Sequence, residues 1–392
     1  MRPTLTLRRG GDRRLRAGHP WIFSNEIETI DGRADNGSAV DVLSASGRFL
    51  GTAYYNRHSL IAARLLSRDD VDIDSVDFFR DKLAAAQAYR DTLYEGRASL
   101  RLVYGEGDGL PGLVVDRYGD VLSIQILTLG LERRLDLIVA ALKAEFNPVA
   151  IVARNDVAVR QLEGLEQEVR LLYGSLPEPL IICENGLRFK VDILGGQKTG
   201  HFLDQKENHL ALKGRVEGRD VLDLFCYSGS WSMHAARFGA RSVTGIDISA
   251  GAVALCRENA RLNFCKESCT FIEADVFAAL RQGEIAGKRW GAIVLDPPAF
   301  VKSKKKLAEA IRGYLTINRR AMELLAPGGY LFTCSCSHHM DETTFLDTLR
   351  TAAAKAGRSM RLVEMRGQSS DHPVLLACPE TSYLKCAILQ AL

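Results

Sequence analysis

Three features that would assign the chain to common protein classes are missing from its sequence. No run of about 18 uncharged apolar residues is present, so the sequence predicts no membrane span. No apolar segment follows Met1, and we therefore expect no secretory signal. The nine cysteines form no Cys-x-x-Cys pair and no spacing typical of zinc ligands, so no metal site is expected. Their odd number and scattered positions favour reduced thiols in a cytoplasmic protein.

The composition that is present is that of an ordinary globular protein with one basic end. The chain has 392 residues, of which 46% are hydrophobic and 25% charged, and this predicts two or three domains. Its net charge is only +3, yet residues 1–25 contain six arginines and one aspartate. Arg8, Arg9, Arg13 and Arg14 lie in this stretch and are candidate contacts for phosphate groups. A solvated arm without a ligand is the alternative interpretation.

The pattern of hydrophobic residues divides the chain into four parts. Residues 1–72 alternate short apolar runs with Gly, Asp and Asn turns and predict a small β domain. Residues 73–97 predict a helical linker, and residues 98–193 predict a small central α/β domain. Strands and helices alternate in residues 194–392, which predicts a parallel sheet covered on both faces.

Acidic residues stand at the ends of successive predicted strands in the last part. Asp223 and Asp247 close the first two strands, Asp275 follows the third, and Asp296 follows the apolar run 292–295. Because the carboxyl ends of parallel strands meet at one edge of a sheet, we expect these acids to line one crevice. The separation between Asp223 and Asp247 is close to the roughly 20 residues at which an acid contacts ribose hydroxyls.

The turn after Asp223 indicates which cofactor this crevice would hold. It leads from a strand through small residues and Gly229 into a helix, but it lacks the three-glycine fingerprint for a pyrophosphate. A pocket lined by carboxylates attracts cations and repels phosphates. S-adenosylmethionine (SAM) carries a sulfonium and an ammonium group and no phosphate, so the electrostatics favour SAM over NAD. A doubly wound domain that binds another nucleotide is the alternative.

An Asp-Pro-Pro sequence follows the fourth strand, with an aromatic residue and lysines behind it. The prolines stiffen the backbone and remove two N–H donors, which suits a flat base lying beside a cofactor. The lysines beyond would suit phosphates. A proline turn with solvated lysines is the alternative. The residues concerned are Asp296, Pro297, Pro298, Phe300, Lys302 and Lys304.

Two cysteines end the predicted strand at 330–334. Cys336 lies further out than Cys334, so we expect it to be the more exposed, and His338, His339 and the lysines after residue 300 would lower its pKa. Carbon 5 of cytosine is methylated only after a thiolate adds to carbon 6, whereas an exocyclic nitrogen needs no thiol. A pair of buried structural cysteines is the alternative interpretation.

Together these residues resemble the bacterial 23S ribosomal RNA cytosine-5 methyltransferases that carry an N-terminal PUA domain. The resemblance covers essentially the whole chain and includes residues 13–26, 197–205 and 333–337. It implies an α/β protein: a PUA β-pseudobarrel that binds RNA, a small central α/β domain, and a Rossmann-like, seven-stranded class I methyltransferase domain. The sequence departs from the family at 227–231, where Thr-Gly-Gly-Phe is frequent, and at Lys206, where arginine is usual.

The resemblance also implies functional residues. Cys336 would attack carbon 6, and Asp296 would orient the cytosine and is the weaker candidate for handling the proton. Asp247 would hold the ribose, Asp275 the adenine, and Asp223 the methionine end of SAM. The implied RNA contacts are Arg8, Arg9, Arg13, Arg14, Pro297, Pro298, Phe300, Lys302 and Lys304. The implied cofactor contacts are Gln197, Thr199, Gly200, Phe202, Asp204, Gln205, Asp223, Phe225, Tyr227, Ser228, Gly229, Asp247, Ile248, Asp275, Val276 and Asp296.

The sequence therefore predicts a SAM-dependent enzyme that forms 5-methylcytidine in 23S ribosomal RNA in the cytoplasm. Two other classes stay open. One is a SAM enzyme that methylates a nitrogen and would tolerate loss of Cys336. The other is a non-catalytic RNA-binding assembly protein. A homodimer is compatible with the sequence, but no residue demands one.

Overall fold

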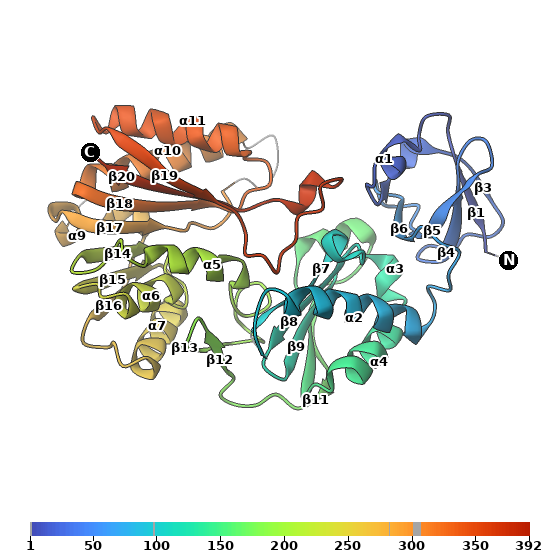
Figure 1. Cartoon of the computed structure of the whole chain (residues 1–392), viewed down its shortest axis with the longest axis horizontal. Coiled ribbons are helices and arrows are strands. Elements are labelled where there is room, and N and C mark those ends of the chain that lie inside the picture. Colours follow the sequence, from blue (N-terminus) through green and yellow to red (C-terminus); the bar gives the residue numbers. More distant parts are fainter. Residues whose placement is uncertain (1, 97–98, 282, 301–306) are drawn as a thin grey trace. The chain divides into compact units, whose positions relative to one another are not determined.

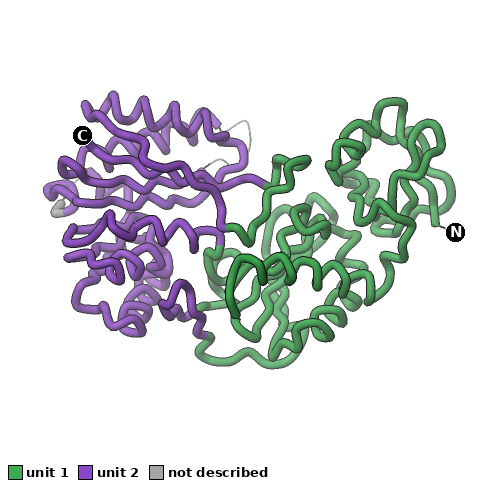
Figure 2. Tube along the Cα trace, in the orientation of Figure 1, with its two compact units in different colours: residues 1–180, 191–203, 370–381 green, residues 181–190, 204–369, 382–392 purple. Residues whose placement is uncertain are grey.

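The computed structural model describes residues 2–96, 99–281, 283–300 and 307–392. The chain forms two compact units, shown in green and purple in Figure 2. The first contains residues 1–180, 191–203 and 370–381, and the second contains residues 181–190, 204–369 and 382–392. These units cut the chain at other places than the predicted boundaries at 72, 97 and 193, so the four-part division stays a prediction.

The N-terminal part of the first unit is a six-stranded sheet in the order β2-β6-β5-β4-β1-β3 (Figure 1). Its strands pair antiparallel, except that β1 and β4 run parallel. Because side chains alternate along a strand, Leu5 with Leu7 and Val40 with Val42 all reach the same buried cluster. The elements are β1 (Thr4–Leu7), α1 (Arg13–Arg16), β2 (Trp21–Ile22), β3 (Ile27–Asp31), β4 (Ala39–Leu43), β5 (Phe49–Tyr55) and β6 (Ala63–Ser67).

The central part of the first unit is a five-stranded sheet in the order β11-β10-β9-β8-β7, packed against three helices. Ser75 begins the first of these helices by accepting a hydrogen bond from the backbone N–H of Phe78 at 3.2 Å. Residues 129–146 form two helices that are separated before residue 135. The elements are α2 (Val76–Asp91), β7 (Leu100–Tyr104), β8 (Leu113–Tyr118), β9 (Val121–Ile126), α3 (Leu129–Glu132), α4 (Leu135–Phe146), β10 (Ala150–Arg154) and β11 (Val169–Gly174).

The second unit contains a seven-stranded sheet in the order β16-β15-β14-β17-β18-β20-β19. Neighbouring strands are parallel except β20, which is antiparallel to both β18 and β19. This order confirms the predicted Rossmann-like, seven-stranded domain. Its strands are β14 (Asp220–Leu224), β15 (Ser242–Asp247), β16 (Cys269–Glu273), β17 (Trp290–Leu295), β18 (Leu325–Ser335), β19 (Met360–Arg366) and β20 (Lys385–Ala391). A separate hairpin pairs β12 (Ile181–Glu184) with β13 (Leu187–Lys190).

Helices cover this sheet and fix the strand ends that carry the site. Tyr314 and Ile317 of α10 and Phe345 of α11 are fully buried against strands β17 and β18, which contributes about 1.5–3 kcal/mol for each large side chain. Figure 1 shows α10 and α11 side by side along the sheet. The helices are α5 (Lys206–His209), α6 (Ser230–Arg237), α7 (Ala250–Leu262), α8 (Val276–Ala279), α9 (Gly283–Gly287), α10 (Leu307–Leu324) and α11 (Glu342–Lys355). Among the described residues, no helix combines the length and apolarity that crossing a membrane requires.

Candidate active site

The register of the parallel strands brings three of the predicted acids to one edge of the sheet. Leu224 of β14 pairs with Ile246 of β15 on one side and with Leu295 of β17 on the other. Asp247 and Asp296 each come one residue after these partners, and Asp223 comes one residue before Leu224. The structure therefore places these three carboxylates around the carboxyl end of β14, as the sequence predicts.

Asp223 is a buried carboxylate with one oxygen left over. Its side chain is fully buried, and Ser232 Oγ donates a hydrogen bond to its Oδ2 at 2.6 Å. Its Oδ1 has no hydrogen-bond partner among the described residues. Burial raises the pKa of Asp223 to about 7; the Ser232 hydrogen bond opposes this rise and the charge of Asp296 adds to it. A buried acceptor without a donor fits a cationic ligand group, such as the ammonium of SAM.

The loop between β14 and α6 has a strained backbone that is held from several sides. Phe225, Tyr227 and Gly229 all have positive φ angles, of 65°, 46° and 80°. The N–H groups of Phe225 and Tyr227 are nevertheless satisfied, by the Ile246 carbonyl at 2.9 Å and by Asp247 Oδ2 at 3.0 Å. Such strain costs on the order of 1–3 kcal/mol for a residue other than glycine, and it is found where a loop is shaped for a ligand.

Gly229 is a position where this loop requires glycine. Besides its positive φ, a Cβ atom there would lie 3.2 Å from Cys256 Sγ. Gly229 is also the N-cap residue of α6. Asn259 of α7 anchors the loop, because its Nδ2 donates to the Ser228 carbonyl at 2.9 Å. Because glycine has no side chain, the backbone at 229 allows close approach by a cofactor.

Asp247 and Ile248, two of the predicted cofactor contacts, lie at and just after the end of β15. Asp247 Oδ1 accepts a hydrogen bond from the Ser249 N–H at 2.9 Å, so both of its oxygens have fixed positions. Each carboxylate oxygen keeps a second lone pair that a hydroxyl group can use. Ile248 is 70% exposed and offers an apolar face.

Asp275 and Val276 have structural roles, in capping a helix and in the core, that the sequence does not indicate. Asp275 is the N-cap of α8, and its Oδ1 accepts a hydrogen bond from the Ala278 N–H at 2.8 Å. Asp275 is exposed, and its second oxygen is available for the adenine contact that the sequence predicts. Val276 is only 2% exposed because its side chain packs into the core. A cofactor contact at Val276 therefore has to come from its backbone.

Asp296 is held by two donors that the sequence does not reveal as a pair. Gln205 Nε2 donates to Asp296 Oδ2 at 2.9 Å, and Trp231 Nε1 donates to the same oxygen at 3.1 Å. Gln205 is itself oriented, because Asn208 Nδ2 donates to its Oε1 at 2.7 Å. Arg366 Nε donates to Asn208 Oδ1 at 3.0 Å. This chain of hydrogen bonds fixes the Asp296 carboxylate at the end of β17.

The residues after Asp296 have different exposures. Pro297 is buried, and Pro298 is exposed. Phe300 is half-buried against Tyr314 and Phe277, with ring centroids 4.7 and 6.1 Å apart. Phe300 therefore has a packing role in addition to its predicted contact with RNA. Lys302 and Lys304 lie outside the described residues.

Cys334 in β18 and Cys336 just beyond its end have different environments. Cys334 is fully buried and pairs in register with Cys386 of β20, whereas Cys336 lies just beyond the end of the strand and is half-buried. Burial, together with the neighbouring Cys386, raises the pKa of the Cys334 thiol, so Cys334 stays protonated. This difference in exposure agrees with the prediction that Cys336 is the accessible thiol.

The cation beside Cys336 is a residue that the sequence reading missed. Burial and the charge of Lys385 lower the pKa of His338, so this histidine is neutral near pH 7 and adds no positive charge. The predicted effect of His338 on the thiol pKa therefore has no contribution from a histidine charge near neutral pH. Lys385 of β20 instead donates to the Ser337 carbonyl at 2.8 Å and is 8% exposed. A lysine within the apolar run at 383–389 was the signal available in the sequence.

The predicted cofactor contacts at 197–205 are divided between the two units. Asp204 and Gln205 belong to the second unit, and Tyr383 Oη donates to Asp204 Oδ2 at 2.6 Å. Gln197, Thr199, Gly200 and Phe202 belong to the first unit. The fully buried Thr199 donates a hydrogen bond to Asp116 and lies 3.1 Å from Tyr118 Oη. The cofactor contacts of these four residues stay a prediction.

Two clusters of metal-ligating residue types occur among the described residues, and hydrogen bonds account for both. In the second unit, Glu184, His209 and His234 are buried with ligand atoms within 4.8 Å of one another. His209 Nδ1 lies 2.8 Å from Glu184 Oε1, and His234 Nδ1 lies 2.8 Å from the Ser230 carbonyl, so each of these nitrogens carries a hydrogen. The other cluster is His19, Cys378 and Glu380, with His19 Nε2 3.2 Å from Glu380.

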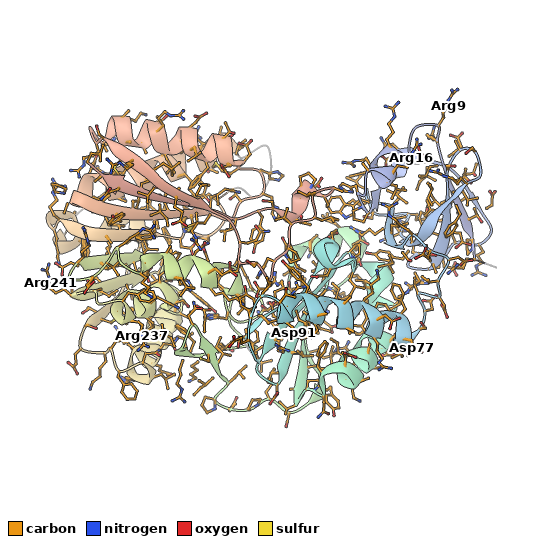
Figure 3. The ribbon with its side chains drawn as sticks, in the orientation of Figure 1. Arg9, Arg16, Asp77, Asp91, Arg237 and Arg241 are labelled. Atoms are coloured by element: carbon orange, nitrogen blue, oxygen red, sulfur yellow. The ribbon has the colours of Figure 1, made fainter. Side chains whose placement is uncertain are left out.

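The predicted RNA contacts of the first unit lie on and just before α1. Arg8, Arg9 and Arg13 are exposed, and Figure 3 shows Arg9 extending away from the ribbon. Arg14 is half-buried, and its guanidinium carbon stands 4.6 Å from the centre of the Phe23 ring. These residues offer a basic surface with an aromatic ring beside it.

Comparisons with known proteins agree with this architecture. A PUA-like domain model matches residues 5–68, and an S-adenosylmethionine-dependent methyltransferase model matches residues 154–381. Proteins named ribosomal RNA large subunit methyltransferase I are similar over their whole length: the Aeromonas hydrophila protein is 41% identical with 100% of both chains covered, and the Shewanella denitrificans protein is 42% identical with 97% of both covered.

Solved structures are similar in fold. A chain from Streptococcus mutans designated a SAM-dependent methyltransferase has a TM-score of 0.83 at 24% identity, with 99% of both chains covered. A methyltransferase complexed with SAH has a TM-score of 0.85 at 22% identity and the same coverage. The family match, the strand order and the unpaired carboxylate oxygen of Asp223 agree on the same cofactor. The chain therefore belongs to the family of S-adenosylmethionine-dependent methyltransferases that carry an N-terminal PUA-like domain.

Proposed function

We propose that the chain transfers a methyl group from SAM to carbon 5 of a cytosine in 23S ribosomal RNA, with Cys336 as the nucleophile. Support for the RNA comes from the names of the full-length relatives and from the PUA-like match. The observation that carries the choice of carbon 5 is a half-buried thiol beside the acidic sheet edge. Leu295 pairs with Thr333, so Asp296 and Cys336 leave adjacent strands at the same edge.

The proposed chemistry begins with the Cys336 thiolate. Its sulfur forms a bond to carbon 6, and the electrons of the bond between carbons 5 and 6 make carbon 5 nucleophilic. SAM supplies the methyl group to carbon 5 and leaves as S-adenosylhomocysteine. A base then removes the proton from carbon 5, the double bond forms again, and the Cys336 thiolate leaves. The product is 5-methylcytidine with the enzyme unchanged.

Asp296 is the residue proposed to hold the cytosine. Its carboxylate, fixed by Gln205 and Trp231, accepts from the exocyclic amino group of the base and so orients carbon 6 toward the thiol. A carboxylate at this position is also the weaker candidate for the base that removes the proton. Pro298 and Phe300 lie on the chain just beyond Asp296 and are proposed to line the space for the ring.

The chemistry of each side chain suggests which part of the cofactor it contacts. The carboxylate of Asp223 is proposed to bind the ammonium group, because its Oδ1 is buried and has no partner among the described residues. Asp247 is proposed to accept from the ribose hydroxyls. Ile248 and Asp275 are proposed to contact the adenine face and its amino group, respectively. Gly229 lets the backbone approach the methionine carboxylate.

The RNA substrate has to present an unstacked base, so single-stranded or loop RNA is proposed. Arg8, Arg9, Arg13 and Arg14 are proposed to contact phosphates, and Lys302 and Lys304 remain part of this prediction. A cytoplasmic location and a homodimer also remain predictions.

Methyl transfer to protein-free 23S ribosomal RNA tests the proposal. The protein is incubated with labelled SAM, and the nucleosides are identified by mass spectrometry for the wild type, Cys336→Ala and Cys334→Ala. We expect 5-methylcytidine from the wild type and from Cys334→Ala, which is the matched control two residues earlier, within β18. We expect none from Cys336→Ala.

Two results contradict the proposal. An N-methylated nucleoside, or transfer that survives Cys336→Ala, assigns the chain to the nitrogen-methylating enzymes. Binding of RNA without any methyl transfer assigns it to non-catalytic assembly proteins.

A further inference from the structure

Lys385 is buried, and the burial of a lysine charge costs free energy. It is the first residue of β20, it is 8% exposed, and it pairs in register with Ser335 at the end of β18. Lysine is almost never this deeply buried unless its charge has partners. The hydrogen-bond partners of the ammonium group indicate the role of this lysine.

Two backbone carbonyls fix the ammonium group beside the turn that carries Cys336. Lys385 Nζ donates to the Ser337 carbonyl at 2.8 Å and to the Tyr383 carbonyl at 2.6 Å. Ser337 is the residue after Cys336, and the Tyr383 ring lies against His338, with ring centroids 5.4 Å apart. An ammonium group has three hydrogens, so one remains for an acceptor other than these carbonyls.

The charges around Lys385 favour its protonated form at neutral pH. Burial lowers its pKa to about 8, and the negative charges of Cys336 and Asp341 oppose this shift. His338 is neutral near pH 7 because burial and the charge of Lys385 lower its pKa. The remaining neighbour on this turn is His339. Lys385 is thus a cation whose charge interacts with that of Cys336.

We propose that Lys385 is a positioning residue that holds Cys336 in its thiolate form, ready for attack on carbon 6. The inference rests on the proposed function, because only a nucleophilic Cys336 needs this help. The ammonium group supplies a fixed positive charge next to the sulfur and takes no part in bond making. No proton transfer between Lys385 and the substrate is required.

The ionisation of Cys336 can be measured without RNA or SAM, so this inference and the proposed function fail separately. Full-length protein is alkylated with iodoacetamide across a range of pH, and the rate at Cys336 is followed by peptide mass spectrometry. We expect an apparent pKa below the value of about 8.5 for a free cysteine. Lys385→Met, which keeps the length of the side chain, should raise it. The rate near neutral pH then falls by about tenfold for each unit of rise.

Two further variants separate charge from packing. Lys385→Arg keeps the positive charge and should restore most of the reactivity. Lys355→Met removes an exposed lysine from α11 in the same unit and should leave the Cys336 profile unchanged. An unchanged profile in Lys385→Met overturns the inference. If that variant does not fold, a wild-type pKa at or above about 8.5 overturns it, because no stabilised thiolate then exists.

Discussion

Asp223 provides the sharpest test of how the cofactor is held. Its carboxylate is fully buried, one oxygen has no partner among the described residues, and its pKa is about 7. A shift of about three units from the ordinary value near 3.9 corresponds to a cost on the order of 4 kcal/mol for the ionised form. The pKa of Asp223 is higher in the folded state than in the unfolded state, so folding is favoured while the carboxyl group is protonated. This contribution to the free energy of unfolding is fully present below about pH 4 and is lost as the pH rises through about 7.

Asp223→Asn should therefore separate stability from cofactor binding. Without SAM, the variant has no charge to bury and should be more stable than the wild type near pH 8, by up to a few kcal/mol. SAM affinity should fall, because the amide leaves the ammonium group without a counter-charge. In the wild type, binding requires the ionised carboxylate, so affinity should weaken roughly eightfold from about pH 7.5 to about pH 6.

Calorimetric titration of SAM against pH and thermal unfolding of the free protein measure these two effects. The matched control is Asp220→Asn, which removes a carboxylate from the opposite end of the same strand. Asp220 is paired with Arg241, whose hydrogen bond holds its pKa low, so it stays ionised throughout this range. If SAM affinity does not change between about pH 6 and about pH 7.5 in the wild type, or survives Asp223→Asn, then Asp223 does not bind the ammonium group.

Three further predictions follow from contacts elsewhere in the chain. Trp231→Phe removes one N–H donor from Asp296, and its methyl-transfer rate constant should fall about tenfold, since a hydrogen bond to a charged group contributes about 1.5–3 kcal/mol. Arg9→Ala with Arg13→Ala should weaken RNA binding and reduce the slope of log affinity against log salt by about 1.5, as measured by filter binding. Ser75→Ala should lower the free energy of unfolding of the first unit by about 1 kcal/mol in urea, because α2 loses its N-cap.

Each of these predictions has an internal control. SAM affinity should change little in Trp231→Phe, and an unchanged transfer rate would show that the indole does not orient the carboxylate. Arg33→Ala removes an exposed arginine that is paired with Asp35, and it should leave the salt slope as it is. Ser75→Thr keeps a capping hydroxyl and should retain most of the stability; equal losses in the Thr and Ala variants would rule out the cap.

The predictable part of the site is the part that strand order alone determines. Asp223, Asp247 and Asp296 follow apolar runs, and parallel pairing brings the ends of such runs together whatever the loops between them do. Cys336 could be singled out because it lies beyond the last apolar residue of its strand. Two of the strands that the sequence did not predict, β11 and β19, lie at sheet edges and have exposed or mixed side chains, so their hydrophobic alternation is weak.

The contacts that were missed join distant segments of the chain. Trp231 and Gln205 meet at Asp296 from 65 and 91 positions away, and no local pattern encodes such a meeting. Lys385 is 48 positions from Ser337, and its role depends on the antiparallel register of β18 and β20. The grouping of residues 181–190 with the second unit is likewise tertiary, because Lys190 contacts Asn259 and Glu258 of α7.

Trapping of the enzyme on an RNA that contains 5-fluorocytidine tests the proposed thiolate mechanism most directly. Fluorine replaces the proton on carbon 5, so after methyl transfer no base can complete the elimination and the bond between sulfur and carbon 6 persists. The account predicts a SAM-dependent covalent complex that survives denaturation, with the RNA attached to the peptide that contains Cys336. A complex mapped to Cys334, or efficient methyl transfer without any covalent complex, contradicts it.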